Sequence, residues 1–292
     1  MNSIKLQAYG KINLVLDVLH QRPDGYHDVR MIMQTVRLHD NIDLRRTSEP
    51  GITIETNLPF LPVNENNLMY RAAKLLMDEF SLPGGVHMKL RKIIPVAAGM
   101  AGGSSDAAAV LHGMNRMFEL SLSPKELAER GVRLGADVPF CLMRGTALSE
   151  GIGEILTPLP PLPDCSIVLA KPTISVSTKY VYSNLHVASL PETAHPDVDR
   201  MQTALEQQSL DEAARAAGNI LETVTCREYP VISEIKSRMM ELGAMTALMS
   251  GSGPTVFALF DQPDTAEKCY RSFRYGPDAG LARQVYLTAP WT

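Results

Sequence analysis

The sequence lacks the features that mark membrane and secreted proteins. No run of about 18 apolar residues occurs in the chain, which excludes an ordinary transmembrane helix. The N-terminal stretch "MNSIKLQAYGKINLVLDVL" has no basic segment followed by an unbroken apolar core, so it does not resemble a secretory signal. We therefore expect a cytoplasmic protein that does not associate with a membrane.

Cysteine is scarce and scattered. The four cysteines are far apart, form no CxxC pair and have no clustered histidines near them, so their spacing predicts neither a disulfide framework nor a zinc site. We interpret all four as reduced and mostly buried thiols, and the sequence names no metal ligand. They are Cys141, Cys165, Cys226 and Cys269.

Positive charge is not concentrated either. The chain has 28 Lys and Arg against 32 Asp and Glu, a net charge of −4, with no basic block that could neutralise a run of nucleic-acid phosphates. Hydrophobic residues make up 45% of the 292 residues, which is typical of a globular chain long enough for about two domains. A small-molecule partner is therefore expected, and a nucleic acid is not.

Hydrophobic spacing predicts a mixed α+β fold. The stretch "KINLVLDVL" alternates apolar and polar residues, which predicts a half-buried strand with Lys11 and Asn13 on one face. Ser123, Pro124 and Glu126 form a capping-box pattern that predicts the start of a helix. The other expected strands are 29–46, 51–56, 85–94, 165–170, 244–249, 256–260 and 283–288, and the other expected helices are 64–80, 104–118, 197–207, 209–223, 230–242 and 264–275.

A proline-rich segment suggests where the chain divides. "TPLPPLPD", residues 157–164, holds four prolines, which a helix or a central strand does not tolerate. We expect a linker there, with an N-terminal domain at 1–158, a C-terminal domain at 164–292 and a cleft between two lobes.

A glycine-rich loop is the most informative stretch. In "PVAAGMAGGSSDAAAVLHGM", residues 95–114, glycines precede the start of a helix, where free backbone N–H groups and the helix dipole favour an anion such as phosphate. Small residues let a polyphosphate approach the backbone. A tight serine-capped turn is the alternative. A second loop of small residues, "SGSGPT" at 250–255, lies between two predicted strands and could approach the same phosphates.

These two loops resemble the phosphate loop and the third motif of the GHMP kinases. "GKINLVLDVLHQRPDGYHDVRMIMQTVRLHD" and "GADVPFCLMRGTALSEGIGE" are similar to those members that phosphorylate a sugar alcohol linked to cytidine diphosphate, in the non-mevalonate route to isoprenoids. The resemblance spans residues 8 to about 260. It implies the two-domain GHMP kinase fold with the active site in the cleft, and ATP with Mg²⁺ as cofactors.

The resemblance also implies roles for individual residues. Lys11 and Asp137 match the catalytic lysine and aspartate, with Asp137 as the base that takes the hydroxyl proton. Positions that match substrate-binding ones are Asn13, Tyr26, His27, Thr178 and Tyr182, of which Tyr26 and His27 read the cytosine. Positions that match ATP-binding ones are Asn67, Lys92, Pro95, Val96, Ala97, Ala98, Gly99, Met100, Ala101, Gly102, Gly103, Ser104 and Ser105. Asp106 and Tyr182 depart from some members, which have asparagine and phenylalanine there.

Other interpretations of these residues stay open. Taken alone, Lys11 could be a solvated charge and Asp137 a helix cap, and Tyr26 and His27 could be ordinary loop residues. Another GHMP enzyme, acting on homoserine or in the mevalonate pathway, would have the same fold, and "DGYH" is the feature that argues against it. A non-catalytic binding protein on the same fold is expected to have lost the base, yet both Lys11 and Asp137 are present.

Overall fold

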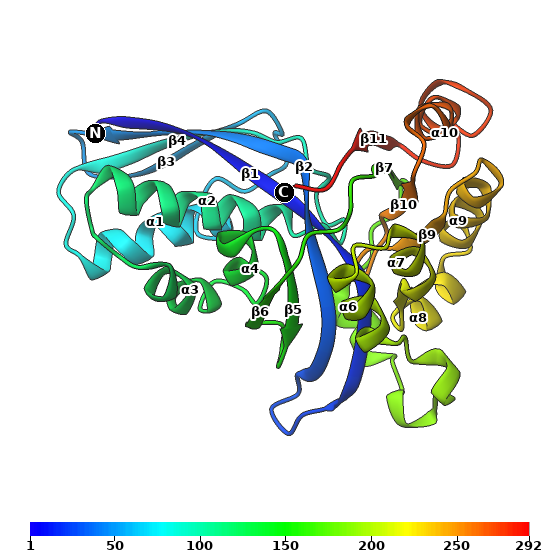
Figure 1. Cartoon of the computed structure of the whole chain (residues 1–292). Helices are drawn as coiled ribbons and strands as arrows, with labels where there is room; N and C mark the ends of the chain where they lie inside the picture. The colour runs from blue at the N-terminus through cyan, green and yellow to red at the C-terminus, as the bar shows by residue number, and fades with distance from the viewer. Residues whose placement is uncertain (292) are drawn as a thin grey trace. The chain divides into compact units, whose positions relative to one another are not determined.

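The computed structural model describes residues 1–291, which form two compact units (Figure 1). Unit 1 contains Met1–Gly10, Leu38–Val96 and Ala101–Arg144. Unit 2 contains Lys11–Arg37, Ala97–Met100 and the chain from Gly145 onward. The long strands β1 (Ser3–Gln21) and β2 (His27–Thr47) each pass from one unit into the other.

Unit 1 is a sheet with helices packed on one face. The sheet contains β3 (Gly51–Thr56) parallel to β4 (Gly85–Arg91), and β4 pairs antiparallel with β2. Inward-facing residues of the sheet pack on α1 (Leu68–Glu79) and α2 (Gly102–Met117) in one apolar core. The shorter helices α3 (Pro124–Val132) and α4 (Val138–Met143) complete this layer.

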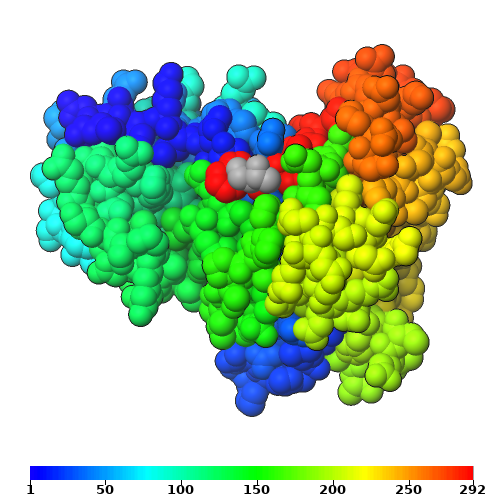
Figure 2. Space-filling model, viewed as in Figure 1, coloured from blue at the N-terminus to red at the C-terminus, as the bar shows by residue number. Residues whose placement is uncertain are grey.

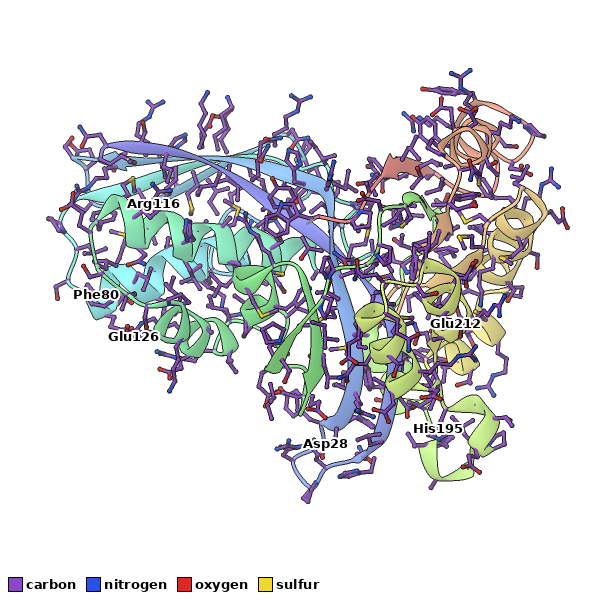
Figure 3. The ribbon with its side chains drawn as sticks, in the orientation of Figure 1. Asp28, Phe80, Arg116, Glu126, His195 and Glu212 are labelled. Atoms are coloured by element: carbon purple, nitrogen blue, oxygen red, sulfur yellow. The ribbon has the colours of Figure 1, made fainter. Side chains whose placement is uncertain are left out.

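Local signals place the helix starts in unit 1. Ser123 and Glu126 form the predicted capping box of α3, so that prediction is confirmed; Figure 3 labels Glu126 at this position. The helix after the glycine loop was expected from Ser104, but α2 begins at Gly102, directly after Ala101 in the left-handed conformation. Gly102 and Gly103 are therefore the first two residues of α2.

Unit 2 is built around a second, antiparallel sheet. Its order is β11 (Gln284–Thr288), β7 (Ser166–Lys171), β10 (Val256–Phe260) and β9 (Thr246–Met249), with α9 (Val231–Glu241) and α10 (Pro263–Tyr275) packed on it. β5 (Thr146–Glu150) pairs with β2 and with β6 (Ile155–Leu159), and β8 (Gly218–Asn219) pairs with β1. The remaining helices are α5 (Thr178–Ser183), α6 (Val198–Glu206), α7 (Leu210–Ala216) and α8 (Glu222–Glu228), with short 3-10 turns at Val187–Ser189 and Glu192–Ala194.

The proline-rich segment is packed and is not a free linker. Thr157 and Pro158 lie in β6, which pairs only with β5 and so leaves its other edge without a ladder that proline would interrupt. Leu162 is buried, and its N–H donates to Gln34 Oε1 at 3.0 Å. The division into domains at 1–158 and 164–292 stays a prediction. The compact units follow a different grouping, in which Lys11–Arg37 belong with the C-terminal half.

Two other expectations differ from the structure. The helix expected over 209–223 is interrupted, because Gly218 and Asn219 leave α7 and pair with Val15 and Leu16 of β1. The strand expected to be half-buried is buried on both faces from residue 10 to residue 18. The short helices α4 and α5 and the strands β5 and β6 were not predicted. Within residues 1–291, no helix has the length and apolar character needed to span a membrane.

Candidate active site

The buried part of β1 in unit 2 carries two polar side chains that contact each other. Lys11 Nζ donates a hydrogen bond of 2.7 Å to Asn13 Oδ1, and both residues are buried. Asn13 Nδ2 in turn contacts Met31 Sδ at 3.1 Å. The predicted common face is confirmed. A lysine side chain is rarely buried unless it is paired with another polar group. The burial of Lys11 therefore argues against its interpretation as a solvated surface charge.

The two loops of small residues meet inside unit 2. Ser250 Oγ donates to Gly99 O at 2.9 Å, and Lys11 N donates to Met100 O at 3.2 Å. Gly99 has a φ of +73°, and a Cβ at this residue would lie 2.0 Å from Ser250 O. Only glycine fits there, so residues 97–100 are held against the second loop by close backbone contact.

Asn219 fixes the second loop from the other side, and sequence reasoning missed it. Its buried Nδ2 donates to Met249 O and to Gly251 O, both at 2.8 Å, and its Oδ1 accepts from Leu221 N. A glycine followed by asparagine, at 218 and 219 within an otherwise helical spacing, was the one available signal. Asn219 also belongs to β8, so it connects this loop to the strand that carries Lys11.

Thr178, a predicted substrate-binding residue, lies beside the same loop. Its hydroxyl is 2.8 Å from Ser252 Oγ, at the first residue of α5. In unit 2, the backbone of residues 97–100 and of the 250–255 loop thus lies close to the side chains of Thr178, Lys11 and Asn13.

The predicted cytosine-reading residues lie at the far end of β1 and β2. The hairpin between these strands reaches the molecular surface (blue in Figure 2), and Tyr26 is 61% exposed on it. The rings of His27 and Tyr182 lie 5.2 Å apart with 47° between their planes. Burial lowers the pKa of His27, which favours the neutral ring that can both donate and accept hydrogen bonds. Figure 3 shows Asp28 and His195 at this end of unit 2.

The rest of the glycine loop belongs to unit 1 and forms the start of α2. The backbone turns at Ala101, with a φ of +53°, so that α2 begins at Gly102. A Cβ on Gly103 would meet only Leu68 Cδ1, at 3.6 Å, so this glycine is not required by packing. Ser105 Oγ donates to Tyr9 O at 2.5 Å, which joins the first turn of α2 to β1. Ser104 lies in this turn too, and Pro95 and Val96 lead into the loop.

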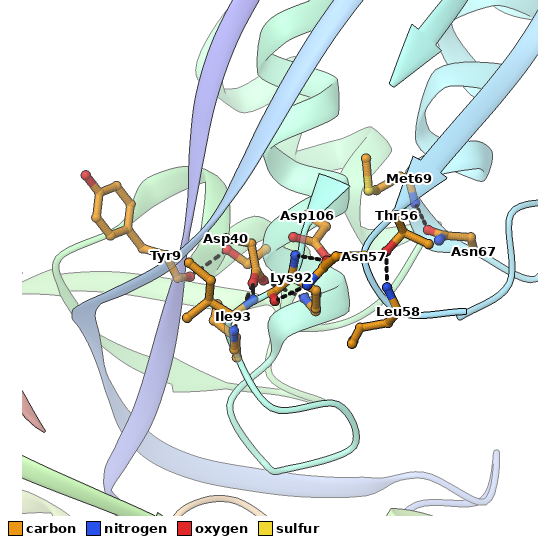
Figure 4. A network of polar contacts seen from close by, with 12 residues as sticks. Tyr9, Asp40, Thr56, Asn57, Leu58, Asn67, Met69, Lys92, Ile93 and Asp106 are labelled. Carbon is orange, nitrogen blue, oxygen red and sulfur yellow. Dashed lines mark hydrogen bonds and ion pairs between the residues drawn. The ribbon is translucent and has the colours of Figure 1, made fainter. Parts of the chain in front are cut away.

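Lys92 lies in a buried ion cluster below this turn (Figure 4). Its Nζ is 2.5 Å from Asp40 Oδ2 and 2.6 Å from Asp106 Oδ2. A Cβ on Gly102 would lie 2.9 Å from the same nitrogen. Asn67, the other position expected near the nucleotide, caps α1, with Oδ1 accepting from Met69 N at 2.9 Å.

Asp137 immediately precedes α4 in unit 1 and is partly exposed. Its backbone C=O accepts from Cys141 N at 3.1 Å, but its side chain makes no capping hydrogen bond to that helix. The Asp137 carboxylate therefore does not act as the cap of α4. Lys11 belongs to unit 2 and Asp137 to unit 1.

Residues 1–291 contain no cluster of three or more His, Cys, Asp or Glu side chains that could hold a metal ion. Mg²⁺ binds readily through substrate phosphates with few protein ligands. The residues present are compatible with a Mg²⁺ ion that binds together with the phosphates of a nucleotide. We assign no protein ligand to this ion.

Comparison with known proteins identifies the family. Residues 67–145 match the GHMP kinases N terminal domain, and residues 201–278 match the GHMP kinases C terminal domain. These segments include the start of α2, Asp137 and the 250–255 loop. The class indicated by the glycine loop and by the fold is thus the GHMP kinases.

Full-length relatives narrow this class. A protein of Lachnoclostridium phytofermentans named 4-diphosphocytidyl-2-C-methyl-D-erythritol kinase is 54% identical over 99% of this chain and 97% of its own length. One of the same name from Lachnospira eligens is 53% identical over all of both chains. A crystal structure of 4-(cytidine 5'-diphospho)-2C-methyl-D-erythritol kinase has 31% identity and a TM-score of 0.83, covering 99% of this chain and 100% of that one. The chain belongs to this family of GHMP kinases.

Proposed function

We propose that this protein transfers the γ-phosphoryl group of ATP to the tertiary 2-hydroxyl of 4-diphosphocytidyl-2-C-methyl-D-erythritol. The products are the 2-phosphate and ADP, and the reaction belongs to non-mevalonate isoprenoid precursor synthesis. The observation that carries the proposal is the full-length identity of about one half to relatives of that name. The reaction needs no nucleic acid and no membrane, and we place it in the cytoplasm.

In this proposal the phosphates bind at the glycine loop. Backbone N–H groups at the start of α2 have no partner within the helix, and the dipole there favours negative charge. Gly103 leaves room for a phosphate, since no protein atom but one methyl of Leu68 is near its Cβ position. The contact between Gly99 and Ser250 fixes the preceding residues, so the loop does not have to be ordered by the nucleotide.

Asp137 and Lys11 act on the hydroxyl in this proposal. The transition state of phosphoryl transfer is loose in most analyses, so catalysis consists mainly of alignment and charge stabilisation. Asp137 accepts the hydroxyl proton, and its carboxylate is not engaged in capping α4. Lys11, oriented by Asn13, supplies a fixed positive charge that stabilises the attacking oxygen. Mg²⁺ neutralises charge on the β- and γ-phosphates when it is bound.

The cytidine end of the substrate binds at the β1–β2 hairpin in this proposal. Tyr26 offers an exposed aromatic face, and the contacting rings of His27 and Tyr182 offer a second surface beside it. Base stacking on an aromatic ring contributes about 1–3 kcal/mol. His27, with its neutral ring, can hydrogen-bond to the polar edge of a pyrimidine.

A panel of acceptors tests the function. Purified protein is incubated with ATP, Mg²⁺ and, separately, the cytidine-linked substrate, homoserine and mevalonate, and ADP release is followed. We expect turnover with the first acceptor only, and a strongly reduced rate in the Asp137→Asn variant. A homoserine kinase structure from Cytophaga hutchinsonii has a TM-score of 0.79 at 20% identity, which shows a shared fold alone. Turnover with homoserine or mevalonate, and none with the cytidine-linked acceptor, would overturn the proposal.

A further inference from the structure

The buried cluster of Asp40, Lys92 and Asp106 has an unbalanced set of charges. Their side chains are 0%, 3% and 4% exposed, respectively. Two ionised carboxylates and one ammonium would leave a net negative charge in the apolar core of unit 1. Taking an uncompensated charge out of water is strongly unfavourable, so one carboxyl group of such a cluster is expected to keep its proton.

Hydrogen bonding distinguishes the two carboxyl groups. Asp40 has three N–H donors: Oδ1 accepts from the backbone N–H groups of Ile93 and Ile94, and Oδ2 accepts from Lys92 Nζ. These donors favour the ionised form. The carboxyl group of Asp40 also hydrogen-bonds to that of Asp106. Asp106 accepts from Lys92 through Oδ2, while its buried Oδ1 has no hydrogen-bond partner within the described part of the chain. Two carboxyl groups can hydrogen-bond to each other only if one of them keeps a proton, and Asp106, which has fewer N–H donors than Asp40, is the group that keeps it.

We propose that Asp106 is a neutral, protonated acid at pH 7, and that its ionisation at alkaline pH weakens the binding of ATP phosphates at the start of α2. Asp106 is then a positioning residue, which acts through the loop and does not touch the reacting atoms. The second half of this inference rests on the proposed function, in which the glycine loop binds ATP.

The surroundings of Asp106 favour its neutral form. Burial raises the pKa of Asp106 to about 8, Lys92 opposes this rise, and the like charge of Asp40 adds to it. Burial also disfavours the charged form of Lys92, but the two carboxyl groups outweigh it and the pKa of Lys92 is raised. Apart from the thiol of Cys141 on α4, the buried residues that α1, α3 and α4 contribute to this core are apolar.

The cluster is coupled to the loop by direct contact. Asp106 lies in the first turns of α2, four residues after Gly102, and a Cβ on Gly102 would be 2.9 Å from Lys92 Nζ. The backbone of Lys92 is itself held by Asn57, which accepts from Lys92 N at 2.7 Å and donates to Lys92 O at 3.1 Å. A full negative charge on Asp106, about one turn into α2, would repel a polyphosphate bound at the start of this helix.

Two measurements on the full chain test the inference. Infrared difference spectroscopy between wild type and Asp106→Asn reports the carbonyl band of a neutral carboxyl group, and needs no ligand. Calorimetric titration with a non-hydrolysable ATP analogue gives its affinity at pH 7 and at about pH 9.5, on either side of the pKa. Asp43→Asn is the matched control, because Asp43 lies on the same strand as Asp40 but is exposed.

We expect a neutral-carboxyl band in the wild type at pH 7 that disappears at about pH 9.5 and is missing from Asp106→Asn. The analogue should bind the wild type and Asp43→Asn about tenfold more weakly at the higher pH, as one added charge close to a polyphosphate implies. Asp106→Asn cannot ionise and should bind with nearly constant affinity.

Absence of the band at pH 7 would overturn the proton on Asp106. An equal pH dependence in wild type and Asp106→Asn would overturn its effect on ATP. If the wild type does not bind the analogue at pH 7, the proposed function fails with the second half of the inference, while the infrared band still decides the protonation of Asp106.

Discussion

Substitution of Gly103 separates the role of the glycine loop in folding from its role in binding. In unit 1, a Cβ at this position meets only Leu68 Cδ1, at 3.6 Å, which is an ordinary van der Waals distance. Gly103 lies in the first turn of α2 and does not have a positive φ. Replacing glycine inside a helix by alanine gains up to about 1 kcal/mol, and valine gains less. Gly103→Ala and Gly103→Val are therefore expected to fold with an unchanged or higher Tm.

ATP binding is expected to respond in the opposite direction. If phosphate oxygens reach the backbone N–H groups at this turn, a side chain at residue 103 occupies the space they need. Each charge-assisted hydrogen bond contributes about 1.5–3 kcal/mol, so losing one or two lowers the affinity by roughly 10-fold to more than 1,000-fold. We expect Gly103→Val to lose detectable binding and Gly103→Ala to fall between it and the wild type.

Calorimetric titration with an ATP analogue, together with thermal unfolding, measures both quantities on each variant. Gly280→Val is the matched control, because a Cβ at this exposed glycine of unit 2 meets no atom within 4 Å, and its φ, like that of Gly103, is not positive. It should bind ATP as the wild type does. Normal affinity in a folded Gly103→Val would refute the reasoning, and the loop would then be a strand-to-helix turn only.

Three further predictions concern the other parts of the site. Asp137→Asn should lower kcat by about 10²–10⁴, Lys11→Met should do comparable damage, and the double variant should be far less impaired than the product of the two, as four kcat values under saturating substrates will show. Tyr26→Ala should raise KM for the cytidine-linked substrate and leave KM for ATP unchanged; steady-state kinetics with each substrate varied would reveal the opposite pattern if the base binds elsewhere. Asn219→Ala leaves two buried carbonyl groups unpaired and should lower the free energy of unfolding by about 2–4 kcal/mol; denaturant unfolding with no change in midpoint would show that the contact is not needed.

Features with a short-range physical cause could be predicted from the sequence. The capping box of α3 needs only residues 123–126, and both of its hydrogen bonds are present. The common face of Lys11 and Asn13 follows from the period of two in a strand, and their side chains are hydrogen-bonded. The small-residue loops at 95–105 and 250–255 were expected to approach the same place, and in unit 2 they touch at Gly99 and Ser250.

Features that depend on residues far apart in the chain could not be predicted in this way. Lys92 was expected near the nucleotide because of a resemblance, but no local pattern indicates that its ammonium pairs with Asp40, 52 residues earlier. Asn219 was placed inside a helix, since helical spacing continues around it, and its pairing with β1 overrides that local preference. The roles predicted for Asp137, Tyr26 and the other site residues stay predictions until they are measured.

The passage of β1 and β2 through both units has a consequence for the newly made chain. Every residue of unit 1 has been synthesised once Arg144 is added, whereas Lys11–Arg37 belong to a unit whose sheet strands β7, β9, β10 and β11 come later. At ~5–20 residues per second, the ribosome needs roughly 7–30 s to produce residues 145–292. During this interval the apolar side chains of Ile12, Leu14 and Val18, fully buried in the finished protein, belong to a unit that is not yet complete. Residues 11–37 are thus made well before most of unit 2, and they reach their final surroundings only when the later segments of that unit are complete.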